Sequence, residues 1–223
     1  MSEPRETLPE NLRSVILSNL EPVRPLKPEW QRAIALLPWA IAALVVYWLS
    51  LTPREDLAQL GVALSWGASI LQALLAVGLG IAALKESTPG SSWPRSTVVA
   101  FALGALGLHV AILLAAFERS KYPEPFGHYG TELQLCFTYQ LPIGLPILAL
   151  GLWLLSRGFA VRSALGGALA GLAAGLLAEA SWRMICPYTH PAHMFPSHTG
   201  TVLLTVLLGT FAGWLMGRRR VRN

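Results

Sequence analysis

Residues 57–84 read LAQLGVALSWGASILQALLAVGLGIAAL and contain no charged side chain. A helix needs about 20 predominantly apolar residues to cross the hydrocarbon core of a bilayer, and this stretch exceeds that length. The composition of the whole chain agrees, because 53% of its 223 residues are hydrophobic and only 13% are charged. A soluble domain carries about 25% charged residues. The sequence therefore predicts a membrane protein, most of which lies within the lipid bilayer.

Five more apolar runs lie on either side of this stretch. They cover residues 33–51, 96–117, 133–156, 163–181 and 199–216. We therefore predict an all-α membrane protein, a six-transmembrane-helix bundle that occupies residues 33–217. A polar N-terminal tail, residues 1–32, precedes the bundle, and a short basic segment, residues 218–223, follows it.

The fifth of these runs contains small residues at helical spacing. They are Gly166, Gly167, Ala170, Gly171, Ala174, Gly175 and Ala178. Small side chains allow two helix backbones to approach closely inside a bilayer. We expect this face to pack against a neighbouring helix.

The distribution of basic residues predicts the orientation of the bundle. With six spans, both termini lie on one side, and most of the 17 lysines and arginines fall in the segments of that side. The opposite side carries Arg54, Arg119, Lys121 and Arg183. Cytoplasmic loops carry an excess of Lys and Arg, so we predict a multi-pass protein of the bacterial inner membrane with both termini in the cytoplasm. The basic residues lie mostly at the ends of the apolar runs, as in inner-membrane proteins, and are not gathered on one element that could enter a nucleic-acid groove. We therefore expect no direct nucleic-acid binding.

The N-terminal tail contains one amphipathic segment. Apolar residues within residues 8–20 line one side of a predicted helix, and they include Leu12, Val15, Ile16 and Leu20. Prolines at positions 22, 25 and 28 keep the following stretch extended. Such a short helix is only marginally stable alone. Either it lies on the lipid surface, or it folds onto a soluble partner.

Cysteine and histidine residues concentrate on the outer face of the predicted bundle. The topology places Cys136 and Cys186 at the outer ends of the fourth and fifth helices. The histidines on that side are His128, His190, His193 and His198. The cysteines form a disulfide, or they form a redox- or metal-responsive pair, or they are simply buried apolar residues. As a metal site, the two thiols with His190, His193 and His198 suit zinc or copper.

Three ionisable residues lie in or near otherwise apolar helices. Glu179 and Arg183 are four residues apart, which predicts an ion pair that shields both charges from lipid. His109 lies deep in the third run. It is either a neutral histidine that is hydrogen-bonded to a neighbouring helix, or an ionisable residue that takes part in the protein's function. A polar path through His109 and Glu179 would indicate a transporter.

The order of several motifs resembles the NrsF family of membrane-embedded anti-sigma factors. The tail ends in LEPVRPL, residues 20–26, and a Glu-x3-Cys pattern (Glu132, Cys136) opens the fourth helix. A Gly- and Ala-rich fifth helix, Cys186 followed by proline, and then His198 complete the resemblance. The resemblance extends over nearly the whole chain.

The resemblance implies a regulator that is not an enzyme. The cytoplasmic tail would bind an extracytoplasmic-function sigma factor and hold it away from RNA polymerase. Oxidants, metals or light-derived reactive oxygen would be sensed through Cys136 and Cys186, which would release the sigma factor. The contact residues that we predict are Leu12, Arg13, Val15, Ile16, Leu20 and Arg24. The alternative is a membrane oxidoreductase or metal-binding protein that uses the outer Cys/His cluster.

Overall fold

The computed structural model describes residues 9–18, 26–120 and 129–222. All regular elements within them are helical, which confirms the predicted all-α class. They are α1 (Glu10–Ser18), α2 (Glu29–Ile34), α3 (Leu37–Ser50), α4 (Leu57–Val62), the π-helical turn η1 (Ala63–Gly67), α5 (Ala68–Lys85), α6 (Arg95–Arg119), α7 (Tyr129–Ser156), α8 (Ser163–Trp182), α9 (Pro191–Met194), the π-helical turn η2 (Phe195–Thr199) and α10 (Gly200–Arg222).

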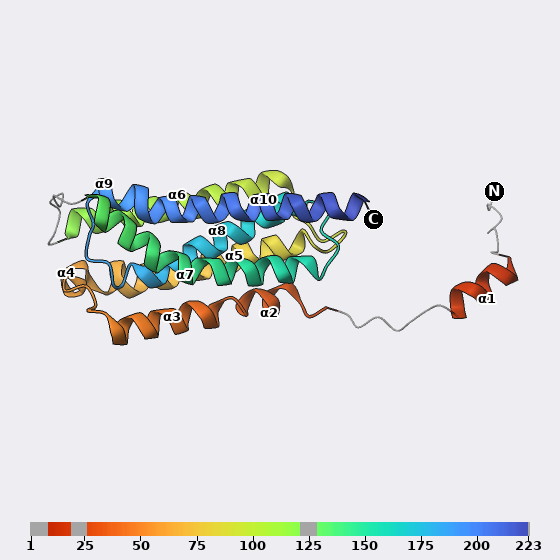
Figure 1. The fold of residues 1–223 in the computed structure, drawn as a ribbon, viewed down its shortest axis with the longest axis horizontal. Coiled ribbons are helices and arrows are strands. Elements are labelled where there is room, and N and C mark those ends of the chain that lie inside the picture. The colour runs from red at the N-terminus through yellow and green to blue at the C-terminus, as the bar shows by residue number, and fades with distance from the viewer. Residues whose placement is uncertain (1–8, 19–25, 121–128, 223) are drawn as a thin grey trace.

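Six helical spans in the described parts of the chain are long and apolar enough to cross a membrane. They are Glu29–Ser50, Leu57–Lys85, Arg95–Arg119, Cys136–Ser156, Ser163–Trp182 and Pro191–Arg219. The spans run along the long axis of one bundle (Figure 1). The bundle end at which α2 begins and α10 finishes is called the tail end below. The opposite end, which holds α4 and α9, is called the cysteine end.

The last span differs from the predicted one. The sixth apolar run begins at residue 199 of the sequence, but the chain is already helical from Pro191. The turns α9 and η2 continue directly into α10, and His193, Ser197 and His198 are buried. Pro191 is well suited to the start of this helix. Proline has no backbone N–H, and an N–H at the first helical position would have no partner within the helix.

Helix α8 lies at the centre of the bundle, in contact with α3, α5, α7 and α10. Nearly all of its residues are buried. Gly167 and Gly171 face the backbone of α10 at Gly209 and Thr205, so closely that a side-chain carbon at either glycine would collide with a backbone carbonyl. The predicted close-packing face of small residues is therefore confirmed, and α10 is its partner.

A side chain of α3 compensates for one of the two prolines inside α7, Pro146. Pro146 has no N–H group, so the carbonyl of Pro142 loses its usual partner within the helix. The Trp39 indole Nε1 donates a hydrogen bond of 3.2 Å to that carbonyl. The helix continues through both prolines.

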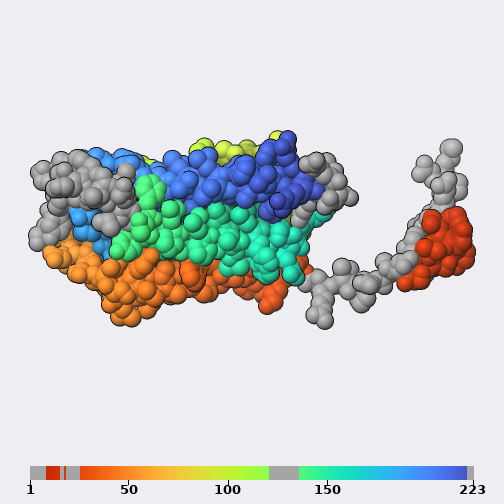
Figure 2. Space-filling model, viewed as in Figure 1, coloured from red at the N-terminus to blue at the C-terminus, as the bar shows by residue number. Residues whose placement is uncertain are grey.

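Large apolar side chains cover much of the outside of the bundle. Examples that are at least half exposed are Ile41, Val46, Leu74, Leu103 and Leu207. The space-filling view shows α3, α7 and α10 side by side along the body of the molecule (Figure 2). An apolar exterior around a core of small residues is the arrangement expected of helices that pack in lipid.

Candidate functional site

Four sulfur- and nitrogen-bearing side chains meet at the cysteine end. Cys136 is on α7 and Cys186 follows α8, whereas His193 and His198 are on α9 and η2. The backbone N–H of Cys186 bonds to the carbonyl of Trp182, so the chain makes one further turn beyond α8. It then folds back, and α9 and η2 lie against α7. We call these four residues the Cys/His cluster.

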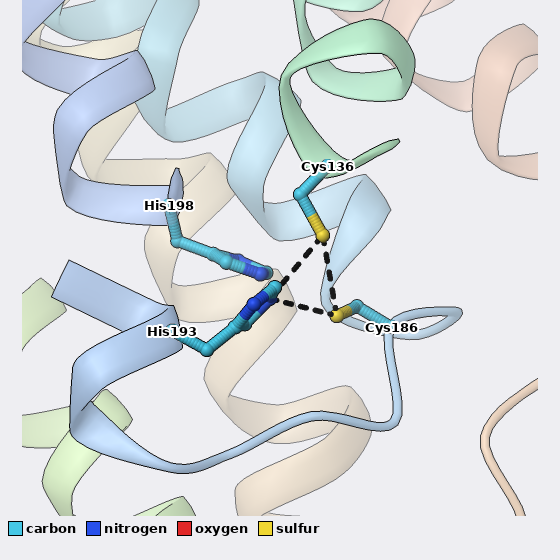
Figure 3. Close-up of side chains that lie close together, drawn as sticks. All are labelled: Cys136, Cys186, His193 and His198. Carbon is cyan, nitrogen blue, oxygen red and sulfur yellow. Dashed lines mark hydrogen bonds between the residues drawn. The ribbon is translucent and has the colours of Figure 1, made fainter. Parts of the chain in front are cut away.

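The polar atoms of the Cys/His cluster point toward a common centre (Figure 3). The two sulfur atoms are 3.6 Å apart. The Nε2 atom of His193 lies 3.3 Å from the Cys136 sulfur and 3.6 Å from the Cys186 sulfur. One ligand atom from each of the four residues lies within 4.8 Å of the others. The sequence prediction that Cys136 and Cys186 share one end of the bundle is confirmed.

The Cys/His cluster is shielded from solvent. All four side chains are buried, and His198 has no exposed surface. The Trp182 indole donates a hydrogen bond of 3.4 Å to the Cys136 sulfur, and the ring of Tyr188 packs edge-on against His193. Burial and the adjacent Cys136 sulfur raise the pKa of the Cys186 thiol well above its ordinary value.

Glu179 contacts the Cys/His cluster from α8. Its Oε2 atom lies 2.7 Å from Nδ1 of His198, and both side chains are fully buried. The other ring nitrogen of His198, Nε2, is buried and has no hydrogen-bond partner among the described residues. The imidazole is therefore held on one side by a carboxylate and directed on the other side into the cluster.

The predicted ion pair between Glu179 and Arg183 is wrong. Glu179 pairs with His198 instead. The Arg183 guanidinium points to another helix, where it donates a hydrogen bond of 2.7 Å to the carbonyl of Leu64. Arg183 follows the end of α8 at Trp182, so its side chain reaches the neighbouring α4–η1 region.

A second buried ion pair at the cysteine end was not predicted from the sequence. Arg54 binds Asp56 through two hydrogen bonds of 2.6 and 2.8 Å, and both side chains are buried. Arg54 also donates to the carbonyl of Arg183, and Ser120 donates to Asp56. Burial alone would raise the pKa of Asp56, but the hydrogen bonds and charge of Arg54 lower it below the ordinary value. The pair fastens the loop after α3 to the end of α8.

His109 lies next to the turn that carries His198. Its Nε2 atom is 3.1 Å from Oγ1 of Thr199, and the side chain is fully buried. This contact between α6 and η2 agrees with the interpretation of a hydrogen-bonded core histidine.

His190 lies outside the Cys/His cluster, although it was one of the three histidines predicted for a metal site. Its Nδ1 atom accepts a hydrogen bond from the backbone N–H of Ala192 and so caps α9. Its ring packs edge-on against Phe117. The predicted set therefore divides, with His193 and His198 beside the thiols and His190 in a capping position.

The predicted sigma-binding residues are described only in part. Within α1, Leu12 and Val15 are 46% and 56% exposed, and Arg13 is exposed. The side chain of Ile16 and the whole of Leu20 and Arg24 lie outside the described residues, as do His128 and the side chain of Glu132. The predicted helix is present at Glu10–Ser18, and its two described apolar side chains are exposed.

The sequence matches the family model described as negative regulator of sigma F, NrsF, over residues 17–222. It is also 30% identical over 203 residues to the anti-sigma-F factor NrsF of Caulobacter vibrioides (strain NA1000 / CB15N). That alignment covers 86% of this chain and 92% of the relative. No solved structure matches the chain.

Proposed function

The chain belongs to the NrsF family of negative regulators of sigma F, and we propose that it is a membrane-embedded anti-sigma factor for an extracytoplasmic-function sigma factor. In this proposal its N-terminal segment binds the sigma factor at the inner membrane and keeps it away from RNA polymerase. An oxidative, metal or light-derived signal then releases it. The observation that carries the proposal is the family match, which extends over nearly the whole chain.

The exposed apolar side chains of α1 support a role in binding. Leu12 and Val15 lie three residues apart, so they share one side of the helix, and both are well exposed. A short helix of this kind gains most of its stability from a partner surface. Binding would therefore be coupled to folding of the segment. Leu20 and Arg24 fall within the matched range, whereas Leu12, Arg13 and Val15 precede it.

The charges at the two bundle ends support a cytoplasmic tail end. Lys85, Arg95, Arg157 and Arg162 lie at helix ends or connections on the tail end. Basic residues accumulate on the cytoplasmic side of membrane proteins. This orientation puts the N-terminal segment in the compartment of the sigma factor and puts the Cys/His cluster near the outer face.

The Cys/His cluster is the sensing element in this proposal, as a reactive thiol pair or with a bound zinc or copper ion. The signal would have to pass from the cysteine end to the tail end. Helix α8 and helix α10 connect the two ends in close backbone contact. A change at Cys186, which follows α8, or at His198, in the turn before α10, would therefore act on two helices that cannot easily move independently.

A pull-down from detergent-solubilised membranes tests the proposal. The full chain and a variant that lacks residues 2–30 are each captured through a C-terminal tag, and the associated soluble proteins are identified by mass spectrometry. The proposal predicts that a sigma factor is captured with the full chain and lost with the deletion. Equal recovery of a sigma factor with both chains, or its absence from both, would contradict it. A membrane oxidoreductase or transporter would show no partner that depends on the tail.

A further inference from the structure

The Cys/His cluster has the composition of a structural zinc site. Zinc in such sites is bound by four cysteine or histidine ligands in a closed tetrahedron, and two of each is one of the common sets. Here one ligand atom of Cys136, Cys186, His193 and His198 lies within 4.8 Å of the others. All four side chains are buried, so no position is left open for solvent.

The distances among three of the four ligand atoms, those of Cys136, Cys186 and His193, suit zinc. Bonds of about 2.3 Å to sulfur and 2.0–2.1 Å to nitrogen, at tetrahedral angles, separate neighbouring ligand atoms by roughly 3.3–3.8 Å. The two sulfur atoms are 3.6 Å apart. His193 Nε2 lies 3.3 and 3.6 Å from them. Both cysteines are free, so neither sulfur is engaged in a disulfide, and both can bind a metal once it displaces their protons.

The free ring nitrogen of His198 is an independent indication of a ligand. A buried polar atom normally has a hydrogen-bond partner, yet Nε2 of His198 has none among the described residues. Glu179 binds the opposite nitrogen, Nδ1. A carboxylate on one nitrogen that fixes the tautomer, with a metal on the other nitrogen, is the usual arrangement around a metal-binding histidine.

The charges also favour a divalent cation. Two thiolates in a buried site are costly unless positive charge accompanies them, and one zinc ion neutralises both. Zinc is preferred to copper because the site is closed, has four ligands and contains equal numbers of sulfur and nitrogen donors.

We propose that Cys136, Cys186, His193 and His198 bind one zinc ion, and that Glu179 is a positioning residue that orients His198. At the cysteine end the ion joins four parts of the chain: helix α7, helix α9, the turn η2, and the segment that follows α8. This inference concerns the sensing element of the proposed function, but neither its structural basis nor its test depends on binding of a sigma factor.

The metal content of the purified full chain tests the inference. The chain is purified in detergent without chelating resin, and zinc is measured by mass spectrometry beside a count of free thiols. We expect about one zinc per chain, and a Cys136→Ser variant that loses it. His190→Asn is the matched control, because it removes a histidine of the same segment and asparagine still caps a helix. The control should retain zinc.

Two further measurements keep the test decisive if a variant fails to fold. Cobalt(II) offered to the metal-free wild type should give the visible absorption of a tetrahedral cobalt–thiolate centre. Glu179→Gln should alter that spectrum and weaken zinc binding about 10–100-fold in competition with a chelator. A general loss of stability would leave the spectrum of the folded fraction unchanged.

Any one of three results would overturn the inference. The wild type contains no zinc and gives no cobalt–thiolate spectrum; the two cysteines of the purified chain form a disulfide; or folded Cys136→Ser retains zinc. Deletion of residues 2–30 should leave the zinc content unchanged. Failure of sigma-factor capture and failure of zinc binding are therefore separate results.

Discussion

Nδ1 of His198 and Oε2 of Glu179 are 2.7 Å apart, and both side chains are fully buried. The contact connects the turn η2, at the start of the last span, to the central helix α8. Ionisable side chains inside a membrane bundle are expensive and persist where they have partners. The pair therefore marks the point at which the Cys/His cluster is attached to the helix that contacts most of the bundle.

Removal of the Glu179 carboxylate should destabilise the protein. In Glu179→Ala the Nδ1 atom of His198 loses its partner inside the bundle, which costs about 1–3 kcal/mol. We expect a lower midpoint of thermal unfolding in detergent. Glu118→Ala is the control, because Glu118 is an exposed carboxylate near the end of α6. Equal midpoints for the two variants would show that the buried contact contributes nothing.

The contact between α8 and α10 should be intolerant of even one methyl group. In Gly171→Ala the new carbon meets the backbone at Thr205 and Val206, and overpacking of this kind costs about 1–3 kcal/mol. Gly104→Ala is the matched control, since a carbon at Gly104 meets no atom within 4 Å. Thermal unfolding should show a loss for Gly171→Ala and no loss for Gly104→Ala. A pair of unchanged midpoints would contradict the close approach of the two helices.

Loss of the Asp56 charge should destabilise the cysteine end. Asp56→Asn leaves the buried guanidinium of Arg54 without its counter-charge, which costs about 3–5 kcal/mol. Because the pKa of Asp56 is lowered in the folded protein, this stabilisation is present above the ordinary carboxyl pKa of about 3.9 and is lost as the pH falls through the lowered value. The stability difference between wild type and Asp56→Asn should therefore shrink on acidification.

That pH dependence can be measured by thermal unfolding between neutral and acidic pH. Glu118→Gln serves as the control, because it removes one exposed carboxylate from the same end of the bundle. We expect the loss of stability relative to wild type to narrow with acidity for Asp56→Asn and to stay small and constant for Glu118→Gln. A constant difference for Asp56→Asn would refute the assigned pKa direction.

Hydrogen peroxide should release zinc from the Cys/His cluster. The Cys136 and Cys186 thiolates together give up two electrons and form one disulfide bond, while peroxide takes those electrons and two protons and becomes two water molecules. The sulfur atoms must close from 3.6 Å to about 2.05 Å, and the ion loses two ligands. A colorimetric zinc indicator should report release in step with the loss of free thiols. Thiol loss without zinc release would contradict this prediction.

The bundle could be predicted from the sequence because each of the six spans contains an apolar run long enough to cross a bilayer, and such runs are recognised by length and composition. The same topology brought Cys136 and Cys186 to one end, since alternate helix ends must share a membrane face. The small residues of the fifth run likewise identified the packing face of α8. These features depend only on the order and length of segments, which the sequence states directly.

The polar pairs could not be predicted in the same way. Whether Glu179 meets Arg183 or His198 depends on how α8 and α10 are rotated about their axes, and sequence spacing does not specify that rotation. The spacing of four residues suggested a partner on the same helix, whereas the structure provides one 19 residues later. Arg54 enters the sequence prediction only as one of the basic residues of the opposite side, although Asp56, two residues later, carries the opposite charge and was a usable signal.

Capture of a sigma factor by charge variants of α1 tests the central claim most directly. Leu12→Glu/Val15→Glu places two charges on the apolar side of the helix, whereas Ser14→Glu adds a charge to a different side of the same exposed helix. The sigma factor recovered with each tagged chain is quantified by mass spectrometry. We expect at least a tenfold loss of sigma-factor recovery for the double variant and near wild-type recovery for Ser14→Glu. Undiminished recovery with the double variant would contradict the assignment of α1 as the sigma-binding element.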